Sequence, residues 1–301
     1  MLINEPGFYS IDPESYHNDP CPESSLSSGI AQLLIERSPA HARHAHPRLN
    51  PDAMPPAEKF LDLGSAIHAL TLGAGPVIHI VNAYKKDGTP ATNFQAKEAQ
   101  EQRANAYTRG QIPLLPDDYE RALNVAVNVK PTIDALIPYP HESELVMIWR
   151  EGPIWCRTMI DRVSKDRTAY LDLKTTAAGA RADEIQRRFF NQGCDIQTAF
   201  IERGLDALHP EGRGRRTGIF QWVEVEAPYA VAQPLIVPES VLHIARRKVQ
   251  AAISLWTQCM TKGEWPSYPQ APLVAAMPPW AEAQWLQREM DDESLKDVEY
   301  E

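Results

Sequence analysis

The sequence is poor in features that would place it in several common classes of protein. Its four cysteines form no C-x-x-C pair, which argues against a thiolate-bound zinc or iron–sulfur site. No stretch reaches the ~18 apolar residues that a membrane helix needs, and the start MLINEPGFYS lacks the basic and apolar regions of a signal peptide. We therefore expect a cytoplasmic protein without a membrane partner or a disulfide framework. The cysteines are Cys21, Cys156, Cys194 and Cys259.

Positive charge is also scarce, since the formal net charge is −10. An acidic protein is a poor candidate for coating nucleic acid nonspecifically, because phosphate contacts need Lys and Arg. A local basic groove is still compatible with this balance. We expect three regions: an irregular arm at 1–24, rich in Pro, Asp, Ser and Glu; a single domain at 25–288; and an acidic tail at 289–301.

The pattern of apolar residues predicts a mixed α/β (α+β) fold with a small mixed central sheet flanked by helices. Strands are expected at 144–150, 154–163 and 168–175, and their short connections predict an antiparallel meander. Residues 218–237 are expected to add one or two strands, and 37–56 are expected to form a loop. Helices are expected near 30–35, 56–72, 93–109, 117–136, 182–190, 195–208, 239–262 and 280–290.

Two acidic residues and one lysine occur on neighbouring predicted strands. In Tyr170-Leu171-Asp172-Leu173-Lys174, strand alternation places Asp172 and Lys174 on one face. Asp161 ends the preceding predicted strand and can reach the same place across the turn. An exposed Asp-x-Lys is common and usually without function, but the two leucines indicate a buried strand. Together these residues favour a functional cluster.

Such a cluster suits hydrolysis of a phosphodiester. Two carboxylates can hold Mg²⁺ or Mn²⁺, which prefer oxygen ligands, and the backbone carbonyl of Leu173 is a plausible further ligand. A bound metal polarises the phosphoryl oxygen and activates water, while Lys174 can stabilise charge on the phosphate.

Five segments, in this order along the chain, carry a resemblance to a known family. They are SLSSGIAQLLIERSPAHARHAHPRLN, LDLGSAIHALTLG, the pair MIDRV and YLDLKTT, and DIQTAFIERGL. The chain resembles the phage and prophage exonucleases similar to exodeoxyribonuclease VIII, within the PD-(D/E)XK superfamily that includes lambda exonuclease. The resemblance implies a restriction-endonuclease-like core, 5′-to-3′ degradation of double-stranded DNA from its ends, a single-strand annealing protein as partner and a homo-oligomeric ring.

The resemblance also implies roles for particular residues. His68 matches a histidine metal ligand, Asp161 and Asp172 match the acidic ligands, and Lys174 matches the catalytic lysine. Gln197 matches a motif glutamine that supports the site or the DNA, and Glu144 matches an acidic position on the first strand. The motif usually ends in tyrosine, where this chain has Ile201. Taken alone, His68 is compatible with a structural histidine, and we assign His41, His44 and His46 to structure or solvent.

Basic residues near these motifs are candidates for contacts with DNA. One cluster follows the Asp-x-Lys strand, a second lies in the Gly-containing segment PEGRGRRTG, and a third lies near the start of the last long predicted helix. Solvated charge explains each cluster equally well. The clusters are Arg181, Arg187 and Arg188; Arg213, Arg215 and Arg216; and Arg246, Arg247 and Lys248.

Three alternatives stay open at this level. The chain could be an endonuclease or a single-strand-specific nuclease of the same superfamily. It could be a non-catalytic protein that binds DNA ends during recombination, although the intact Asp161, Asp172 and Lys174 set argues against that. It could be an unrelated α/β metal-binding protein if the carboxylates do not converge in space.

Overall fold

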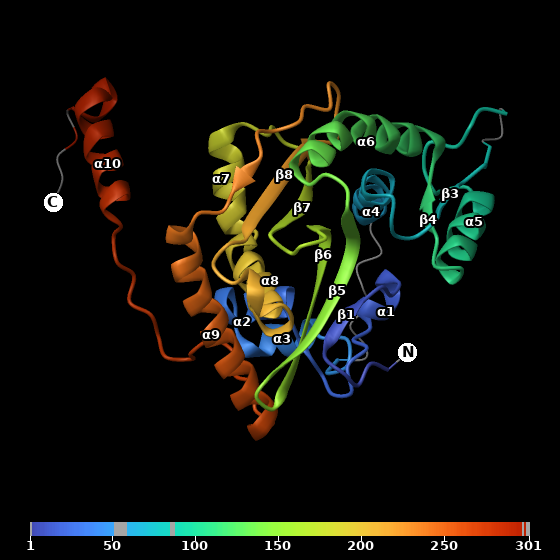
Figure 1. Cartoon of the computed structure of the whole chain (residues 1–301). Coiled ribbons are helices and arrows are strands. Elements are labelled where there is room, and N and C mark those ends of the chain that lie inside the picture. The colour runs from blue at the N-terminus through green and yellow to red at the C-terminus, as the bar shows by residue number, and fades with distance from the viewer. Residues whose placement is uncertain (1, 51–58, 85–87, 297, 299–301) are drawn as a thin grey trace. The chain divides into compact units, whose positions relative to one another are not determined.

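The computed structural model describes residues 2–50, 59–84, 88–296 and 298, and a mixed β-sheet lies at its centre (Figure 1). The strands of this sheet follow the order β1-β5-β6-β7-β8-β9, and β2 pairs with β6. A separate two-stranded sheet joins β3 to β4. The strands are β1 (Gly7–Tyr9), β2 (Leu26–Ser27), β3 (Ile78–Ile80), β4 (Ile112–Leu114), β5 (His141–Glu151), β6 (Ile154–Ser164), β7 (Ala169–Thr176), β8 (Thr217–Glu224) and β9 (Leu235–Ile236).

The predicted antiparallel meander is confirmed, because β5, β6 and β7 are adjacent and antiparallel. One or two further strands were expected in 218–237, and two are present there, β8 and β9. β8 runs parallel to β7, since the connection between them crosses over through α7 (Ala182–Asn191) and α8 (Cys194–Leu208). Both helices therefore follow the Asp-x-Lys strand β7 directly in the sequence.

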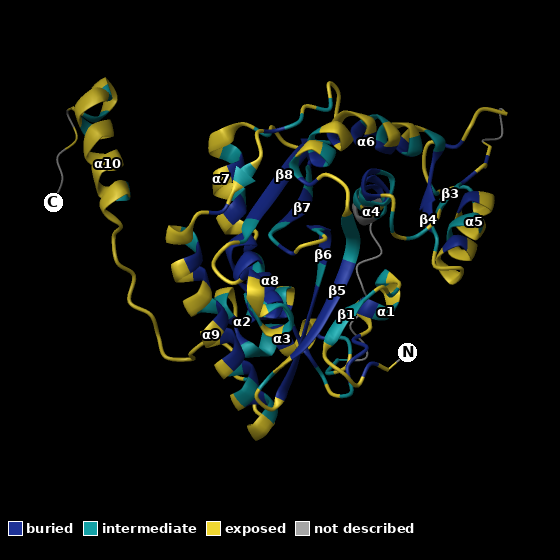
Figure 2. Cartoon of the chain, in the orientation of Figure 1, coloured by how far each residue is buried: buried dark blue, intermediate teal, exposed yellow. Residues whose placement is uncertain are grey.

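Helices cover the sheet and bury two apolar cores (Figures 1 and 2). One core is formed with α2 (Ser28–Glu36), α8 and α9 (Glu239–Lys262), and it includes Trp149, Phe200 and Trp256. The other is formed with α4 (Lys59–Leu72) and α6 (Pro116–Leu136), and it includes Leu171 and Leu173. The leucines that alternate with Asp172 and Lys174 therefore hold β7 against α4 and α6.

Helix α8 lies close to the sheet because it has a glycine where the two meet. A Cβ atom on Gly204 would lie 2.9 Å from the ring of Trp149 on β5, which is closer than normal packing allows. Trp149 also packs against Phe200 with ring centroids 5.0 Å apart. This contact sets how closely α8 packs against the sheet, and therefore how far Gln197 of α8 lies from the strands.

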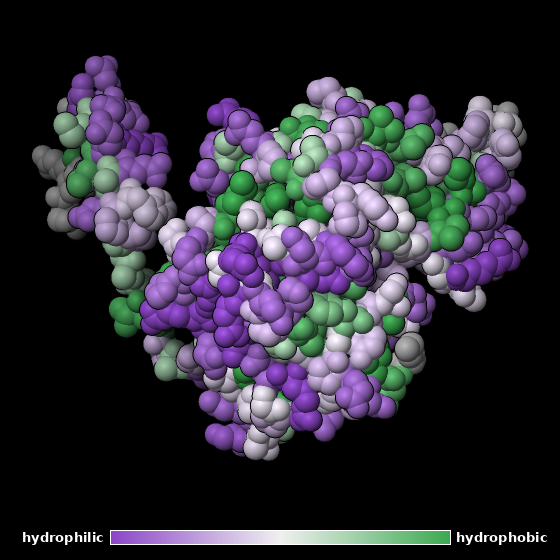
Figure 3. Space-filling model, viewed as in Figure 1, coloured by the Kyte–Doolittle hydropathy of each residue, from purple (hydrophilic) through white to green (hydrophobic). Residues whose placement is uncertain are grey.

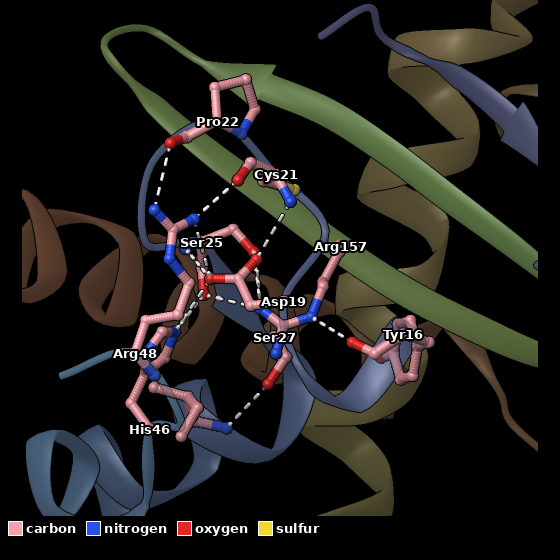
Figure 4. A network of polar contacts seen from close by, with 10 residues as sticks. Tyr16, Asp19, Cys21, Pro22, Ser25, Ser27, His46, Arg48 and Arg157 are labelled. Carbon is pink, nitrogen blue, oxygen red and sulfur yellow. Dashed lines mark hydrogen bonds and ion pairs between the residues drawn. The ribbon is translucent and has the colours of Figure 1, made fainter. Parts of the chain in front are cut away.

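A buried polar network attaches the N-terminal segment to β6 (Figure 4). Arg157 of β6 donates to the carbonyl oxygens of Tyr16 at 3.1 Å and Ser25 at 3.0 Å, and it forms an ion pair with Asp19 at 3.2 Å. His46 lies 3.4 Å from the same Asp19 carboxylate. We call these five residues the N-terminal network.

Two expectations about the N-terminal part are corrected. The segment 1–24 is not irregular throughout, because β1 pairs with β5 and α1 (Pro13–His17) follows it. The part of 37–56 that is described contains α3 (Pro39–Ala45), which begins with Pro39 after Ser38. These elements are too short for apolar periodicity to reveal them. The expected start of α4 at 56–58 lies outside the described residues.

The remaining helices agree with the predicted ones within a few residues. The helix expected at 93–109 is α5 (Lys97–Thr108), and the one expected at 280–290 is α10 (Pro279–Asp291). Short 3₁₀ turns occur at Pro210–Gly212 and Glu293–Leu295. Among the described residues, no helix combines the length and apolarity needed to cross a membrane.

The chain divides into two units, Met1–Ser267 and Tyr268–Glu301. The first contains both apolar cores. The second contains α10, which has no buried residues. The predicted site residues, which include Asp161, Asp172 and Lys174, all lie in the first unit.

Candidate active site

The predicted site lies where two strands of the sheet separate. β6 pairs with β5 along most of its length, and β7 pairs with β8 throughout. In the described structure, β6 and β7 pair with each other at two positions, Arg162 with Leu171 and Val163 with Tyr170. Asp161 and Asp172 are the next residues on the two strands. The Asp161 carboxylate accepts a hydrogen bond from the backbone N–H of Leu173 at 2.8 Å, so a side chain bridges the strands here.

Asp172, Lys174 and Gln197 form a connected group. The Lys174 Nζ lies 2.8 Å from Asp172 Oδ2 and donates to Gln197 Oε1 at 3.2 Å. Gln197 Nε2 donates to Asp172 Oδ1. Burial is the largest single influence and lowers the pKa of Lys174, but the charge and hydrogen bond of Asp172, together with other nearby groups that include Asp161, raise the pKa above its usual value. The lysine is therefore a fixed positive charge.

Asp161 and His68 are the second pair at the site. His68 Nδ1 of α4 lies 3.5 Å from Asp161 Oδ2. Burial, followed by the charge of Asp172, raises the pKa of Asp161 to about 6. The two carboxylates are therefore close enough to repel each other, which is the convergence expected from the sequence.

Glu144 of β5 lies beside this group. Its neighbours Ser143 and Leu145 pair with Arg162 and Ile160, so Glu144 is opposite Asp161 in the register. Its backbone has a positive φ of 49°. Burial raises the pKa of Glu144, and the charge of His68 partly offsets that effect. Its carboxylate is directed at the loop after α4, where a Cβ on Gly75 would lie 3.0 Å from it.

The side chains present suit a hard divalent cation, although they are not preassembled around one. Asp172 Oδ2 is buried and, apart from the Lys174 ion pair, accepts no hydrogen bond from the described residues. Two carboxylates and one imidazole are neighbours, a donor set suited to Mg²⁺ or Mn²⁺. Within the described ranges, however, no three His, Cys, Asp or Glu residues already form a metal-binding group. The Leu173 carbonyl ligand stays a prediction.

The arginines that follow β7 differ in their environment. Arg181 and Arg187 are exposed and pair with Asp183 at 3.3 Å and Glu184 at 2.5 Å. Arg188 is three-quarters buried and donates to Thr176 at the end of β7. The sequence did not predict this contact between α7 and β7, because a threonine at the end of a strand forms no recognisable motif with a later arginine.

The arginines of the loop before β8 are partly structural. The side chain of Arg216 is only 2% exposed and pairs with Asp206. It also donates to the carbonyl oxygens of Leu205 and His209. The expectation that Arg216 contacts DNA is therefore not supported. Arg213 pairs with the same Asp206 at 3.1 Å but is exposed, and Arg215 donates to the carbonyl oxygen of Glu211.

The basic residues of α9 mostly join α9 to α8. Lys248 pairs with Asp195 at 2.6 Å, and Arg246 pairs with Glu202 at 3.0 Å. Arg247 is exposed. Ile201, which replaces the motif tyrosine, is 1% exposed and belongs to the apolar core between α8 and the sheet. It has no polar role at the site.

Comparisons with known proteins identify a family and a similar fold. The family model described as "PDDEXK-like domain of unknown function (DUF3799)" matches residues 28–271. The chain is similar in fold to the crystal structure of a candidate exonuclease from Eubacterium rectale, with a TM-score of 0.58, 10% identity, and coverage of 91% of this chain and 98% of that chain.

Other comparisons add little. The crystal structure of SSO0001 has a TM-score of 0.32 at 10% identity, with 77% of each chain covered, which is too low to carry an argument. A comparison with curated proteins finds no significant match. Because the family model covers most of the sequence and the fold has the expected mixed core, the chain belongs to the family of PDDEXK-like domains of unknown function.

Proposed function

We propose that this protein is a metal-dependent deoxyribonuclease. The observation that carries the proposal is the convergence of Asp161, Asp172 and Lys174 where β6 and β7 separate. A divalent cation, commonly Mg²⁺ in PD-(D/E)XK nucleases, supplies Lewis acidity toward the phosphate and activates water when bound. Asp161, Asp172 and His68 would hold it.

The protein's own residues have distinct roles in this proposal. Lys174 keeps its proton and stabilises negative charge that develops on the phosphate. Gln197 contacts both Lys174 and Asp172, so it fixes their relative orientation. Glu144 is a further acidic group opposite Asp161 in the β5–β6 register, and burial raises its pKa above the usual value.

We further propose 5′-to-3′ exonuclease action on linear double-stranded DNA in phage-type recombination. The ordered His, Asp, Asp-x-Lys and Gln segments support this more specific activity, and the similar structure from Eubacterium rectale is described as a candidate exonuclease. A ring-shaped homo-oligomer in the cytoplasm and a single-strand annealing partner complete the proposal. The exposed Arg181, Arg187, Arg213 and Arg215 and the part-buried Arg188 are the proposed DNA contacts.

The proposal is tested by incubating the purified chain with end-labelled linear, closed circular and single-stranded DNA. Each substrate is tested with Mg²⁺, with Mn²⁺ and with EDTA. Asp172→Asn is compared with Asp183→Asn, an exposed aspartate control. We expect metal-dependent loss of linear duplex from its ends and an inactive Asp172→Asn variant.

The same assay separates the alternatives. Cleavage of closed circles would indicate an endonuclease, and degradation of single strands alone would indicate a single-strand-specific enzyme. If wild type leaves every substrate intact with either metal, the nuclease proposal fails. Binding to DNA ends without cleavage would then identify a non-catalytic recombination protein.

A further inference from the structure

A cleft lies beside the candidate site, between two parts of the molecule that are far apart in the sequence. One wall is the segment from β1 to α1, and the other comprises the loop after α4 and the end of α5 (Figure 1). Figure 3 shows α5 at the right-hand edge of the surface, with the part that contains α1 below it. The cleft has a volume of about 670 Å³, and β5 contributes Ser143 and Glu144 to its lining. We call this the α1–α5 cleft.

Glu144 links the cleft to the candidate site. It is opposite Asp161 in the β5–β6 register. Burial raises the pKa of Glu144 and the charge of His68 partly offsets this effect, so His68 is also near. The Glu144 carboxylate lies against the loop after α4, where a Cβ on Gly75 would be 3.0 Å away, and Gly75 itself lines the cleft. A substrate bound at Asp161 is therefore adjacent to the cleft.

The charge of the lining disfavours a phosphate in the cleft. Among the described residues, the lining has three acidic side chains and one basic side chain, namely Asp12, Glu14, Glu144 and Arg109. The Asp12 carboxylate already accepts from the backbone N–H and the hydroxyl of Ser15, both at 2.7 Å. Within the described structure, no hydrogen bond engages the carboxylates of Glu14 and Glu144. The cleft therefore repels phosphate but offers free carboxylate oxygens to hydrogen-bond donors.

The other lining residues suit the flat face of a nucleobase. Part-buried apolar side chains lie on both walls, with Ile11 and Pro13 on the wall that contains α1 and Ala74 and Pro76 on the other. Pockets of about 300–1,000 Å³ that combine apolar walls with a few polar groups are typical sites for small ligands. The cleft is therefore large enough for one nucleobase with its sugar.

We propose that the α1–α5 cleft accepts the unpaired base of a nucleotide at the DNA end while the phosphate is held at Asp161, Asp172 and Lys174. This inference rests on the proposed nuclease function. In the sheet, β5 lies beside β6 on the side away from β7. A nucleotide that lies across the sheet with its phosphate between β6 and β7 therefore directs its base toward β5 and the cleft.

The free carboxylate of Glu14 predicts which bases the cleft holds best. A carboxylate accepts hydrogen bonds and donates none, so it binds bases through their N–H groups. Guanine presents a ring N–H and an amino group side by side, and both can donate to one carboxylate. Such binding uses the edge that pairs in a duplex, so the base must first leave its pair. That cost is lowest where pairing is already weak, as at a DNA end.

The test compares duplexes that differ in a single nucleotide and have the same phosphates. At the first or second position from the end, this nucleotide carries guanine, hypoxanthine, which lacks the amino group, or no base, and it is mismatched with its partner. Binding to the full chain is measured by fluorescence anisotropy with Ca²⁺, and initial rates of digestion are measured with Mg²⁺. We expect the guanine duplex to bind about tenfold more tightly than the base-free one, with hypoxanthine in between.

Two variants locate the effect in the cleft. Glu14→Gln keeps the size of the side chain but removes the carboxylate, so it should reduce the difference between guanine and hypoxanthine. Ser10→Trp places a large side chain in the cleft, so it should remove the difference between guanine and no base. Glu5→Gln, at an exposed residue of the same N-terminal segment outside the lining, is the control and should discriminate like wild type. Circular dichroism and thermal unfolding confirm that each variant is folded.

The outcomes separate this inference from the nuclease proposal. The base-binding role is overturned if wild type binds and digests all three duplexes equally at both positions, or if both cleft variants discriminate like wild type. The nuclease proposal survives either result as long as DNA is digested. If wild type digests none of the duplexes, the nuclease proposal fails, and the binding comparison alone then decides whether the cleft holds a base.

Discussion

Strand β6 carries two buried charged clusters, and their carboxylates differ in the direction of their pKa shifts. Burial opposes ionisation of Asp19, but hydrogen bonds from His46 and Ser25 and the charge of Arg157 lower its pKa to about 2. Four residues after Arg157, Asp161 has a pKa raised to about 6 by burial and by Asp172. The surroundings of Asp19 therefore stabilise its ionised carboxylate, whereas the surroundings of Asp161 destabilise its ionised carboxylate.

The difference lies in the partners that each carboxylate has. Asp19 accepts hydrogen bonds from the backbone N–H of Ser25 at 2.8 Å and from the Ser25 hydroxyl at 2.7 Å. It also lies beside Arg157, Arg48 and His46. Asp161 accepts one backbone hydrogen bond, lies 3.5 Å from His68 and has another carboxylate beside it, so its charge is less well compensated than that of Asp19. Carboxylates whose pKa is raised in this way are typical of functional sites. The partners of Asp19 therefore indicate a structural role for the N-terminal network, and those of Asp161 support the proposed chemical role.

The largest expected effect is on activity. Lys174→Met should lower the nuclease rate by about 10³-fold or more, because no other described cation contacts Asp172 and the transition-state charge loses its donor. Initial rates of linear duplex digestion measure the effect. Lys165→Met, at an exposed lysine on the turn after β6, is the matched control and should stay active. A Lys174→Met rate within tenfold of wild type would contradict the role of the lysine.

A substitution in the N-terminal network should lower stability, in contrast to the loss of activity expected for Lys174→Met. Asp19→Ala leaves Arg157 buried without its ion-pair partner, so it should lower the free energy of unfolding by about 3–5 kcal/mol. Denaturant unfolding measures this, with Asp183→Ala as the exposed control. Since the folded pKa of Asp19 is depressed, its contribution is present above about pH 4 and is lost as pH falls toward 2. An Asp19→Ala protein as stable as wild type would remove the contrast between the clusters.

Asp161→Asn should stabilise the metal-free protein while abolishing activity. The amide keeps an oxygen for the Leu173 N–H but carries no charge near Asp172. Because the folded pKa of Asp161 is raised, wild type loses stability as pH rises from about 4 through 6. Unfolding in EDTA should therefore show a variant more stable by about 1–2 kcal/mol above pH 6. The difference should shrink below pH 6, and an unchanged difference down to pH 4 would argue against this origin.

The smallest expected effect concerns orientation at the site. Gln197→Ala removes the side chain that contacts both Lys174 and Asp172. It should lower the rate about tenfold, equivalent to ~1.4 kcal/mol, with little change in stability because the residue is only part-buried. Gln192→Ala, at the exposed end of α7, is the control. Equal rates for the two variants would show that Gln197 is not a positioning residue.

The strands of the candidate site were predictable because alternation is a local property. Leu171 and Leu173 mark β7 as buried, which fixes the direction of Asp172 and Lys174 without knowledge of the rest of the chain. The roles of Arg216 and Lys248 were not predictable in this way. Each is neutralised by an acidic residue on α8 that the sequence alone does not place beside it, and such pairing depends on how α8 packs.

The N-terminal part shows the same limit. β1 has three residues and gains its partner from β5, more than a hundred residues later. Arg157 likewise looks like an ordinary strand arginine until Asp19 and Ser25 are brought to it. Long-range contacts decided what these residues do, whereas local patterns sufficed for the helices α6, α8 and α9.

The separation of β6 from β7 gives the site two independently supported halves. β5 and β6 form one ribbon of paired strands, which carries Glu144 and Asp161. β7 and β8 form another, which carries Asp172 and Lys174. The two ribbons pair with each other at two positions, and the hydrogen bond from Leu173 N–H to Asp161 adds one further link between them. We therefore expect the distance between the two carboxylates to be less constrained by backbone pairing than the spacing of residues within either ribbon.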